Sequence, residues 1–248
     1  MRDAAASWLV PDWPASANVR AVVTTREDPE GQPESIRGFN VGTRCGDDPA
    51  AVARHRACLI ETLCLPGQPR WLRQVHGTNV AIDPAHQEPE ADAAITRTPG
   101  VVLAIQTADC LPVLFAADDG TEIAAAHAGW RGLAAGVLEH TLDAIQASRI
   151  GTMAWLGPAI AGPSYEVGDE VREAFLAHDP EAVAAFSATR PGHWTCDLYA
   201  LARQRLRAAG ITRIFGGGMD TFTDPRLHSH RRDGARSGRM ASVIWLAR

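Results

Sequence analysis

The sequence lacks the features that mark secreted and membrane proteins. Its five cysteines are scattered along 248 residues, odd in number and without framework spacing, which favours reduced thiols over a disulfide scaffold. No window of about 18 residues is apolar, and the N-terminal stretch Met1–Ser16 has no apolar core of signal-peptide length. We therefore expect a cytoplasmic protein that has no membrane partner.

Positive charge is scarce as well. Lysine and arginine number 24 against 29 aspartates and glutamates, so the net charge is −5 and no broad nucleic-acid-binding surface is implied. A phosphate-binding GxxxxGK[ST] loop is missing, and the glycines of Gly129–Gly136 are too irregular for a dinucleotide fingerprint. With 46% hydrophobic and 21% charged residues, the composition is that of a globular protein with one sizeable core. Because no repeat or composition break interrupts the chain, we expect a single domain over 1–248.

The hydrophobic pattern predicts strands and helices that interleave. Short apolar runs bounded by turn signals indicate strands at Val19–Thr25, Arg70–Val75, Val101–Ile105, Leu111–Ala117, Glu122–Ala126, Met153–Leu156, Ile211–Phe215 and Met240–Leu246. Helical spacing and capping residues indicate helices at Ala50–Leu63, Gly132–Ser148, Gly168–His178 and Leu198–Ala209. The segment Arg70–Ile82 resembles a hairpin around Gly77. Since the order has no regular βαβ rhythm, the predicted class is α+β, with mixed β-sheets and packed helices.

Two imidazoles and one thiol follow these apolar runs. His76 directly follows Arg70–Val75. Cys110 lies between the runs Val101–Ile105 and Leu111–Ala117, and His127 directly follows Glu122–Ala126. Three nitrogen and sulfur ligands that leave a fourth position open are typical of a catalytic zinc, whereas a structural zinc more often has a fourth Cys or His. Spacing alone leaves open the alternative that these residues bind no metal, because a histidine in a turn and a cysteine buried as a small hydrophobic residue would give the same pattern.

Several motifs carry a resemblance to a known family. RQVHG (Arg73–Gly77), TADCLPV (Thr107–Val113) and AHAGWRG (Ala126–Gly132) closely resemble the YfiH-like laccase-domain family, and the likeness continues through RRDGARSGRMASVIWL (Arg231–Leu246). Members of this family have been called polyphenol oxidases and purine nucleoside phosphorylases. The resemblance implies a YfiH-like fold and a zinc enzyme whose metal ligands and catalytic residues include His76, Cys110 and His127. It further implies phosphorolysis of adenosine, inosine, guanosine or methylthioadenosine, and deamination of adenosine, so the partners are purine nucleosides and phosphate.

Polar neighbours of these three residues are candidates for supporting roles. Asp109 could transfer a proton or orient a ligand, or could bond its own backbone as a turn residue. Gln74 could orient an imidazole or a water. Arg131 could face the pocket or pair with an acid at the start of a helix.

The densest positive cluster lies between Arg226 and Arg239. Arginine forks suit phosphate oxygens, although a solvated, salt-bridged loop would have the same sequence. The family resemblance favours Arg232 as the anion ligand. Arg26 and Asn40 fall on family-like positions and could line the same pocket or form turns.

Two other enzyme classes fit the same residues. Without a metal, Cys110 would be the nucleophile and His127 its base, as in a hydrolase that edits peptidoglycan precursors. Copper in place of zinc would serve phenol oxidation, although few of the nine histidines are placed to bind it. His228 and His230 could hold a second metal, but polar variation at the pocket rim is the preferred interpretation. We expect a monomer.

Overall fold

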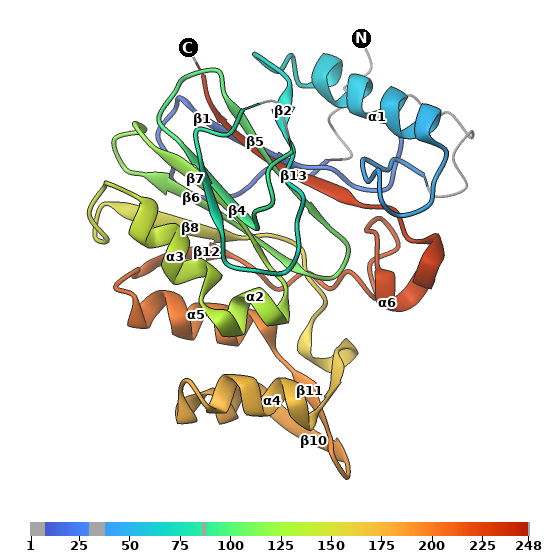
Figure 1. Cartoon of the computed structure of the whole chain (residues 1–248), viewed down its shortest axis with the longest axis vertical. Helices are drawn as coiled ribbons and strands as arrows, with labels where there is room; N and C mark the ends of the chain where they lie inside the picture. Colours follow the sequence, from blue (N-terminus) through green and yellow to red (C-terminus); the bar gives the residue numbers. More distant parts are fainter. Residues whose placement is uncertain (1–7, 30–37, 86–87, 248) are drawn as a thin grey trace.

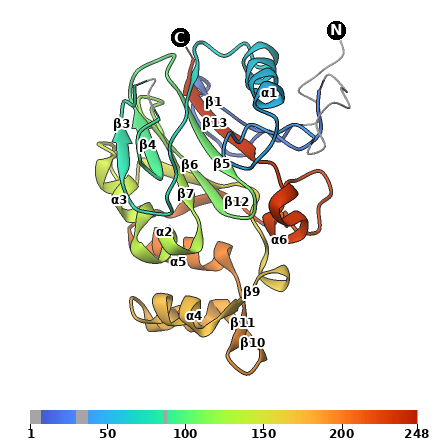
Figure 2. The same cartoon turned by 45° about the vertical axis from the view of Figure 1, so that its right-hand side comes forward.

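Two β-sheets packed face to face form the centre of the molecule (Figures 1 and 2). The computed structural model describes residues 8–29, 38–85 and 88–247. The four-stranded sheet has the order β1 (Val19–Val23), β13 (Met240–Leu246), β5 (Val102–Thr107), β2 (Pro69–Arg70). The six-stranded sheet has the order β12 (Arg213–Gly216), β8 (Thr152–Leu156), β6 (Leu111–Ala117), β7 (Ile123–Ala128), β4 (Ala93–Thr96), β3 (Val80–Ile82). Parallel and antiparallel pairs occur in both sheets, which confirms the predicted α+β class with mixed sheets.

Alternation along the strands explains the layers. In β5, Leu103 and Ile105 pack between the two sheets, whereas Val102 and Ala104 pack under α1 (Pro49–Thr62). In β6 every residue is buried, because one face meets the other sheet and the opposite face meets helices. A strand covered on both faces needs no polar residues, so its sequence is a continuous apolar run. This is why the central strands could be predicted from hydrophobicity.

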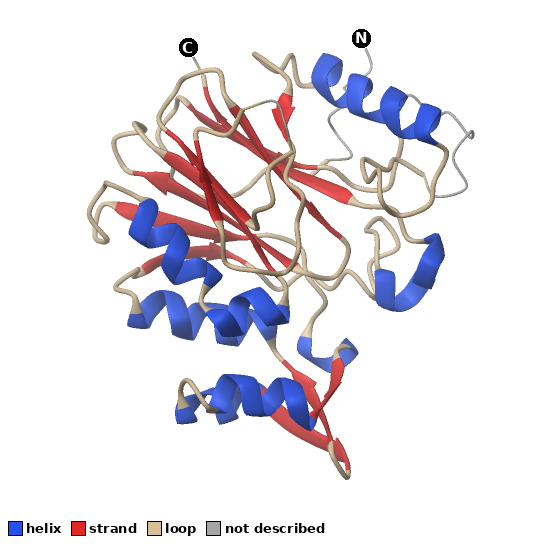
Figure 3. Ribbon diagram, in the orientation of Figure 1, coloured by secondary structure: helices blue, strands red, loops and turns tan. Residues whose placement is uncertain are grey.

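Helices cover the outer face of each sheet (Figure 3). α1 begins after the cap Asp48, whose carboxylate accepts from the Ala50 N–H, and lies over the four-stranded sheet. The six-stranded sheet is covered by α2 (Trp130–Ala135), α3 (Val137–Ala144) and α5 (Leu198–Ala208). Asp197 caps α5 through the Ala200 N–H, as predicted.

A smaller layer lies at one end of the molecule. Its three strands have the order β10 (Phe186–Arg190), β11 (His193–Cys196), β9 (Glu166–Gly168), and α4 (Asp169–Leu176) packs beside them (Figure 1). Among the described residues, the short helical segments are η2 (Gly162–Ser164), η3 (Pro180–Ala185), α6 (His230–Asp233) and η4 (Gly234–Arg236). Among the residues that the structure describes, no helix combines the length and apolar character that crossing a bilayer requires.

Two sequence predictions are corrected by the structure. The helix predicted over Gly132–Ser148 is two helices, because Gly136 adopts a left-handed conformation with φ of 99° and turns the chain between α2 and α3. The predicted strand Arg70–Val75 and hairpin Arg70–Ile82 do not form. β2 ends at Arg70 and pairs with β5, whereas β3 begins at Val80 and pairs with β4 in the other sheet. The intervening segment crosses between the sheets.

Candidate metal centre

The three residues predicted as metal ligands converge in the structure. The donor atoms of His76, Cys110 and His127 all lie within 4.8 Å of one another, and the Cys110 Sγ is 3.8 Å from the His76 Nε2. The two imidazole rings meet edge to face, with centroids 4.8 Å apart. His127 is buried, Cys110 is half-buried and His76 is exposed, so the cluster opens to solvent on one side.

Local structure explains how residues so far apart in sequence meet. His76 lies on the segment that crosses from β2 to β3, and Cys110 lies on the turn from β5 to β6, which also crosses between the sheets. His127 is the penultimate residue of β7, and alternation turns its side chain toward the space between the sheets, the side that Ile123 and Ala125 also face. All three therefore lie at one end of the layer between the sheets.

Asp92 holds two of the candidate ligands, His76 and His127, in place. Its Oδ1 accepts from the His127 Nδ1 at 2.8 Å and from the His76 N–H at 2.9 Å, and its Oδ2 accepts from the N–H groups of Gly77 and Val75 at 2.7 and 3.1 Å. These bonds stabilise His76 at a φ of 62°, a left-handed conformation that is unfavourable for a non-glycine residue. With Nδ1 engaged, His127 has only its Nε2 available as a ligand.

The electrostatics of the cluster favour charged forms. Burial alone would raise the pKa of Cys110, but the adjacent His127 and His76 outweigh burial and lower it to about 6. Burial alone would lower the pKa of His127, but Cys110 and Asp92 outweigh burial and raise it to about 9. Burial also opposes ionisation of Asp92, yet the hydrogen bonds from His127 and the backbone hold its pKa below the ordinary value. The thiolate is the form of cysteine that binds metals and attacks carbon.

The donor set fits a metal ion. Bonds of roughly 2.0–2.3 Å place tetrahedral nitrogen and sulfur ligands about 3.3–3.8 Å apart, close to the separation of the Cys110 Sγ and the His76 Nε2. Gly129 leaves the necessary room, since a Cβ there would lie 2.9 Å from both the Cys110 Sγ and the His76 Cδ2. Two imidazoles and a thiolate suit a borderline-soft ion such as zinc or copper.

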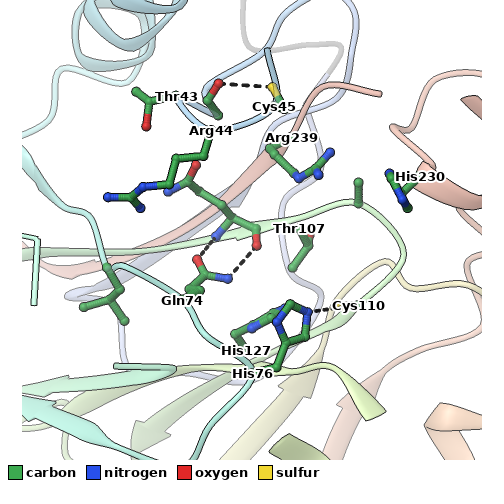
Figure 4. Close-up of a pocket in the computed structure, with 14 residues that line it drawn as sticks. Thr43, Arg44, Cys45, Gln74, His76, Thr107, Cys110, His127, His230 and Arg239 are labelled. Carbon is green, nitrogen blue, oxygen red and sulfur yellow. Dashed lines mark hydrogen bonds between the residues drawn. The ribbon is translucent and has the colours of Figure 1, made fainter. Parts of the chain in front are cut away.

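The cluster forms one end of a cavity of about 380 Å³, within the roughly 300–1,000 Å³ typical of small-molecule sites. Figure 4 shows the side chains that surround it. Besides the three ligands, the lining residues are Gly42, Thr43, Arg44, Cys45, Leu72, Gln74, Gln106, Thr107, Ala108, His230 and Arg239. The cavity is therefore large enough for a small organic substrate beside the metal cluster.

Gln74 and Asp109 both act on the backbone near the ligands. The Gln74 amide donates to the Gln106 carbonyl and accepts from the Gln106 N–H, both at 2.8 Å, and so ties the His76 segment to β5. Asp109 has a φ of 86°, and its carboxylate accepts from the Thr221 hydroxyl at 2.7 Å and from the Arg231 N–H at 2.6 Å. Asp109 does not line the cavity, since its carboxylate holds the turn that precedes β6.

The predicted phosphate ligands lie outside the cavity lining. The Arg232 guanidinium is engaged by the Asp233 carboxylate and by backbone carbonyls that include those of Thr221 and Leu227. Arg26 pairs with the same Asp233 at 3.6 Å. The Arg131 guanidinium stacks over the Trp130 ring at 4.4 Å.

Asn40 is fully buried and serves the backbone around the cavity. Its Oδ1 accepts from the N–H groups of Gly42 and Arg239 at 2.9 and 2.7 Å, and its Nδ2 donates to Asp47 at 2.8 Å. These bonds join the loop that begins at Gly42 to the start of β13. The side chain predicted to bind substrate is thus placed to position two segments that line the cavity.

His228 and His230 do not form the pair on one strand face that a second metal would require. His228 is buried, and its Nε2 donates to the Phe39 carbonyl at 2.9 Å. Burial, together with the charges of Arg26 and Arg239, lowers its pKa to about 4 in spite of that bond, so the ring is neutral. His230 begins α6 and lies at the rim of the cavity.

Sequence reasoning missed Asp92, Thr107 and Arg239. Asp92 did leave a signal, because a single acid inside the apolar stretch Ala91–Ile95 has to be paired once that stretch is buried. Thr107 and Arg239 belong to the motifs that carry the resemblance, but nothing in their local sequence separates them from their polar neighbours.

Comparison with known proteins agrees with the motifs. The family model described as multi-copper polyphenol oxidoreductase laccase matches residues 20–247. A Xylella fastidiosa protein named purine nucleoside phosphorylase is 50% identical over 97% of both chains, and Escherichia coli purine nucleoside phosphorylase YfiH is 47% identical over 96% of this chain and 98% of the relative. The crystal structure of a Neisseria meningitidis protein, 43% identical, superposes with a TM-score of 0.91 over 98% of this chain and 100% of that one. The chain therefore belongs to the multi-copper polyphenol oxidoreductase laccase family, which is the YfiH-like family that its motifs predict.

Proposed function

We propose that this protein is a zinc-dependent purine nucleoside phosphorylase that also deaminates adenosine. The observation that carries the proposal is the cluster of His76, Cys110 and His127 at one end of a cavity of small-molecule size. The names of the Xylella and Escherichia relatives support the reaction class, since both match almost the whole chain. Adenosine, inosine, guanosine and methylthioadenosine are the proposed nucleosides, and inorganic phosphate is the second substrate.

In phosphorolysis, a phosphate oxygen forms a bond to the ribose C1′ while the bond from C1′ to the purine nitrogen breaks. The products are the 1-phosphate of the sugar (ribose 1-phosphate for adenosine, inosine and guanosine) and the free base, which takes up a proton at nitrogen. The protein must therefore hold an anion beside the sugar and exclude water from C1′. The cavity lining supplies arginine and threonine side chains for the anion.

Deamination of adenosine replaces the amino group at C6 with oxygen from water and releases ammonia. Zinc bound by His76, Cys110 and His127 would supply Lewis acidity that lowers the pKa of a water. Asp92 keeps the His127 Nε2 directed at the cluster. Both carboxylate oxygens of Asp109 are occupied by Thr221 and Arg231, so we assign it to holding the Cys110 turn rather than to proton transfer.

A hydrolase that uses Cys110 as nucleophile is the second candidate. It is favoured by the lowered pKa of Cys110 and by the 3.8 Å between its Sγ and the His76 Nε2. Such an enzyme would cleave a peptidoglycan precursor without any metal. The description of the family also names copper, and the same three side chains suit a single copper ion for phenol oxidation.

The deciding experiment is a product assay on adenosine, with and without phosphate, using protein loaded with zinc or with copper. We expect adenine only when phosphate is present, and inosine with or without phosphate. Cys110→Ala should abolish both activities and release zinc, whereas Cys64→Ala, at an exposed cysteine outside the cavity, should change neither. Zinc-loaded protein that forms neither adenine nor inosine would overturn the proposal and leave the hydrolase or the copper oxidase.

Location and assembly follow the same proposal. Nucleosides and phosphate are cytoplasmic metabolites, and reduced thiols such as Cys110 suit that compartment. We propose a cytoplasmic monomer, because the cavity and its metal ligands are all supplied by one chain. Sedimentation of the zinc-loaded protein would test the monomer, and a dimer at micromolar concentration would contradict it.

A further inference from the structure

Two polar side chains of the cavity have no partner for part of their hydrogen-bonding capacity. The Arg239 Nη1 donates to the carbonyls of Ser237 and Gly238 at 3.0 and 2.8 Å, but its Nε and Nη2 have no partner among the residues that the structure describes. Thr107 is 2% exposed, and its hydroxyl has neither donor nor acceptor within reach in the described part of the chain. Buried polar groups are almost always paired, so an unpaired one beside a cavity points to a ligand.

These two residues line the same cavity and are close in the strand pairing. Met240 pairs with Thr107 in the register of β13 and β5, so Arg239 immediately precedes the residue opposite Thr107. Figure 4 shows Thr107 between Arg239 and the metal cluster, and shows the Arg239 guanidinium directed toward His230. Cys110 follows Thr107 by one short turn, so this pair lies next to the metal ligands along β5.

The other arginines of the region each have a carboxylate partner. Arg44 also lines the cavity, and its Nη2 pairs with Glu88 at 2.7 Å. Arg232 and Arg26 share the Asp233 carboxylate. Among the described residues that line the cavity, Arg239 is thus the arginine whose charge no carboxylate offsets.

We propose that Arg239 and Thr107 form the binding subsite for inorganic phosphate, with His230 at its rim. The inference rests on the proposed phosphorolysis, and it moves the anion site from Arg232 to Arg239. A guanidinium offers two parallel N–H donors that match two oxygens of a tetrahedral anion, and the threonine hydroxyl adds a third donor. The subsite places the phosphate beside the cluster of His76, Cys110 and His127 rather than on it, so a metal held there would not have to bind the phosphate.

The frame around Arg239 is built to keep it in place. Its backbone N–H donates to the Asn40 Oδ1, which also accepts from Gly42. A Cβ at Gly42 would lie 2.6 Å from the Arg239 Cγ, so the arginine stem packs directly on the glycine backbone. A side chain that is fixed in this way loses little conformational freedom when it binds a ligand. Asn40 and Gly42 are therefore positioning residues for the subsite.

Steady-state kinetics of the zinc-loaded, full-length protein tests the subsite. Arg239→Gln should raise the KM for phosphate about 10- to 100-fold, the size expected for lost charge-assisted hydrogen bonds, while the KM for the nucleoside changes less than about twofold. Thr107→Val should raise the KM for phosphate about 3- to 10-fold. Its melting temperature should not fall, because the lost hydroxyl has no partner among the described residues. The control is Arg236→Gln, an exposed arginine of the same loop outside the cavity, which should leave both KM values unchanged.

Direct binding separates this subsite from the proposed reaction. Titration of inorganic phosphate, followed by ³¹P line broadening, should show saturable binding to the wild type, and weaker binding to both Arg239→Gln and Thr107→Val. That result supports the subsite even if adenosine is not phosphorolysed, in which case the proposed function alone fails. Phosphorolysis with an unchanged KM for phosphate in both variants would overturn the subsite and leave the function standing. Failure of the wild type to bind phosphate would also overturn the subsite. If Arg239→Gln does not fold, Thr107→Val carries the test.

Discussion

Replacing Asp92 with asparagine should weaken zinc binding without unfolding the protein. The carboxylate accepts four hydrogen bonds, from the His127 ring and from the N–H groups of Val75, His76 and Gly77. Asparagine has one oxygen, so two of the four donors lose their acceptor. At about 1.5 kcal/mol for each bond to a charged group, the loss of stability is about 3 kcal/mol, less than the total of most domains.

The effect on the metal follows from the proton on His127. If the asparagine NH2 takes the place of Oδ1, the His127 Nδ1 must accept, and its proton moves to Nε2, the atom needed as ligand. We expect zinc affinity to fall about 10- to 100-fold, or about 1.4–2.7 kcal/mol. Competition with a chromophoric chelator measures this, with Asp143→Asn as control, since Asp143 is exposed, lies outside the cavity lining and pairs with Arg149. A folded Asp92→Asn protein with wild-type zinc affinity would refute the assigned role.

Three further perturbations test the site and its frame. Gly129→Ala should weaken zinc binding at least about 10-fold in the same competition assay, because its Cβ would displace the Cys110 sulfur or the His76 ring. Tyr199→Phe should cost about 1–3 kcal/mol in urea unfolding, since its buried hydroxyl serves three backbone groups. The pKa of His228 is about 4 when folded and about 6.5 when unfolded, so the unfolded chain binds the proton first. Stability should therefore fall by up to about 3 kcal/mol between pH 6.5 and 4, and His228→Asn should flatten this slope in pH-dependent unfolding.

The sequence predicted the strands that are buried on both faces and the helices that begin at a local capping residue. β6 and β13 are buried on both faces, so their apolar runs have nearly the bounds of the strands. The starts of α1 and α5 were predictable because Asp48 and Asp197 cap them through N–H groups only two or three residues away. A capping side chain and the N–H group it binds lie within the same few residues, so the local sequence is sufficient to predict the cap.

The sequence could not predict features that depend on distant partners. Gly136 fits inside a helical pattern, and only the packing of α2 and α3 makes it a turn. Asp92 bonds residues 15 to 17 positions before it and 35 positions after it, so no local pattern shows its role. The local sequence does not distinguish Arg232 from Arg239. In the structure, the Arg232 guanidinium is engaged by Asp233 and by backbone carbonyls, whereas the Nε and Nη2 of Arg239 have no partner among the described residues.

The position of the site follows from how the chain passes between the two sheets. The segments β2–β3 and β5–β6 each leave the four-stranded sheet and enter the six-stranded sheet, and each carries one ligand at the crossing, His76 and Cys110. Each crossing also contains a non-glycine residue in a left-handed conformation, His76 itself and Asp109 beside Cys110, held by side-chain hydrogen bonds. Strain of this kind persists only where surrounding contacts over-determine it. Because the same crossing that delivers Cys110 begins with Thr107, the metal cluster and the proposed phosphate subsite share one structural origin, and a perturbation of the Asp109 turn should affect both.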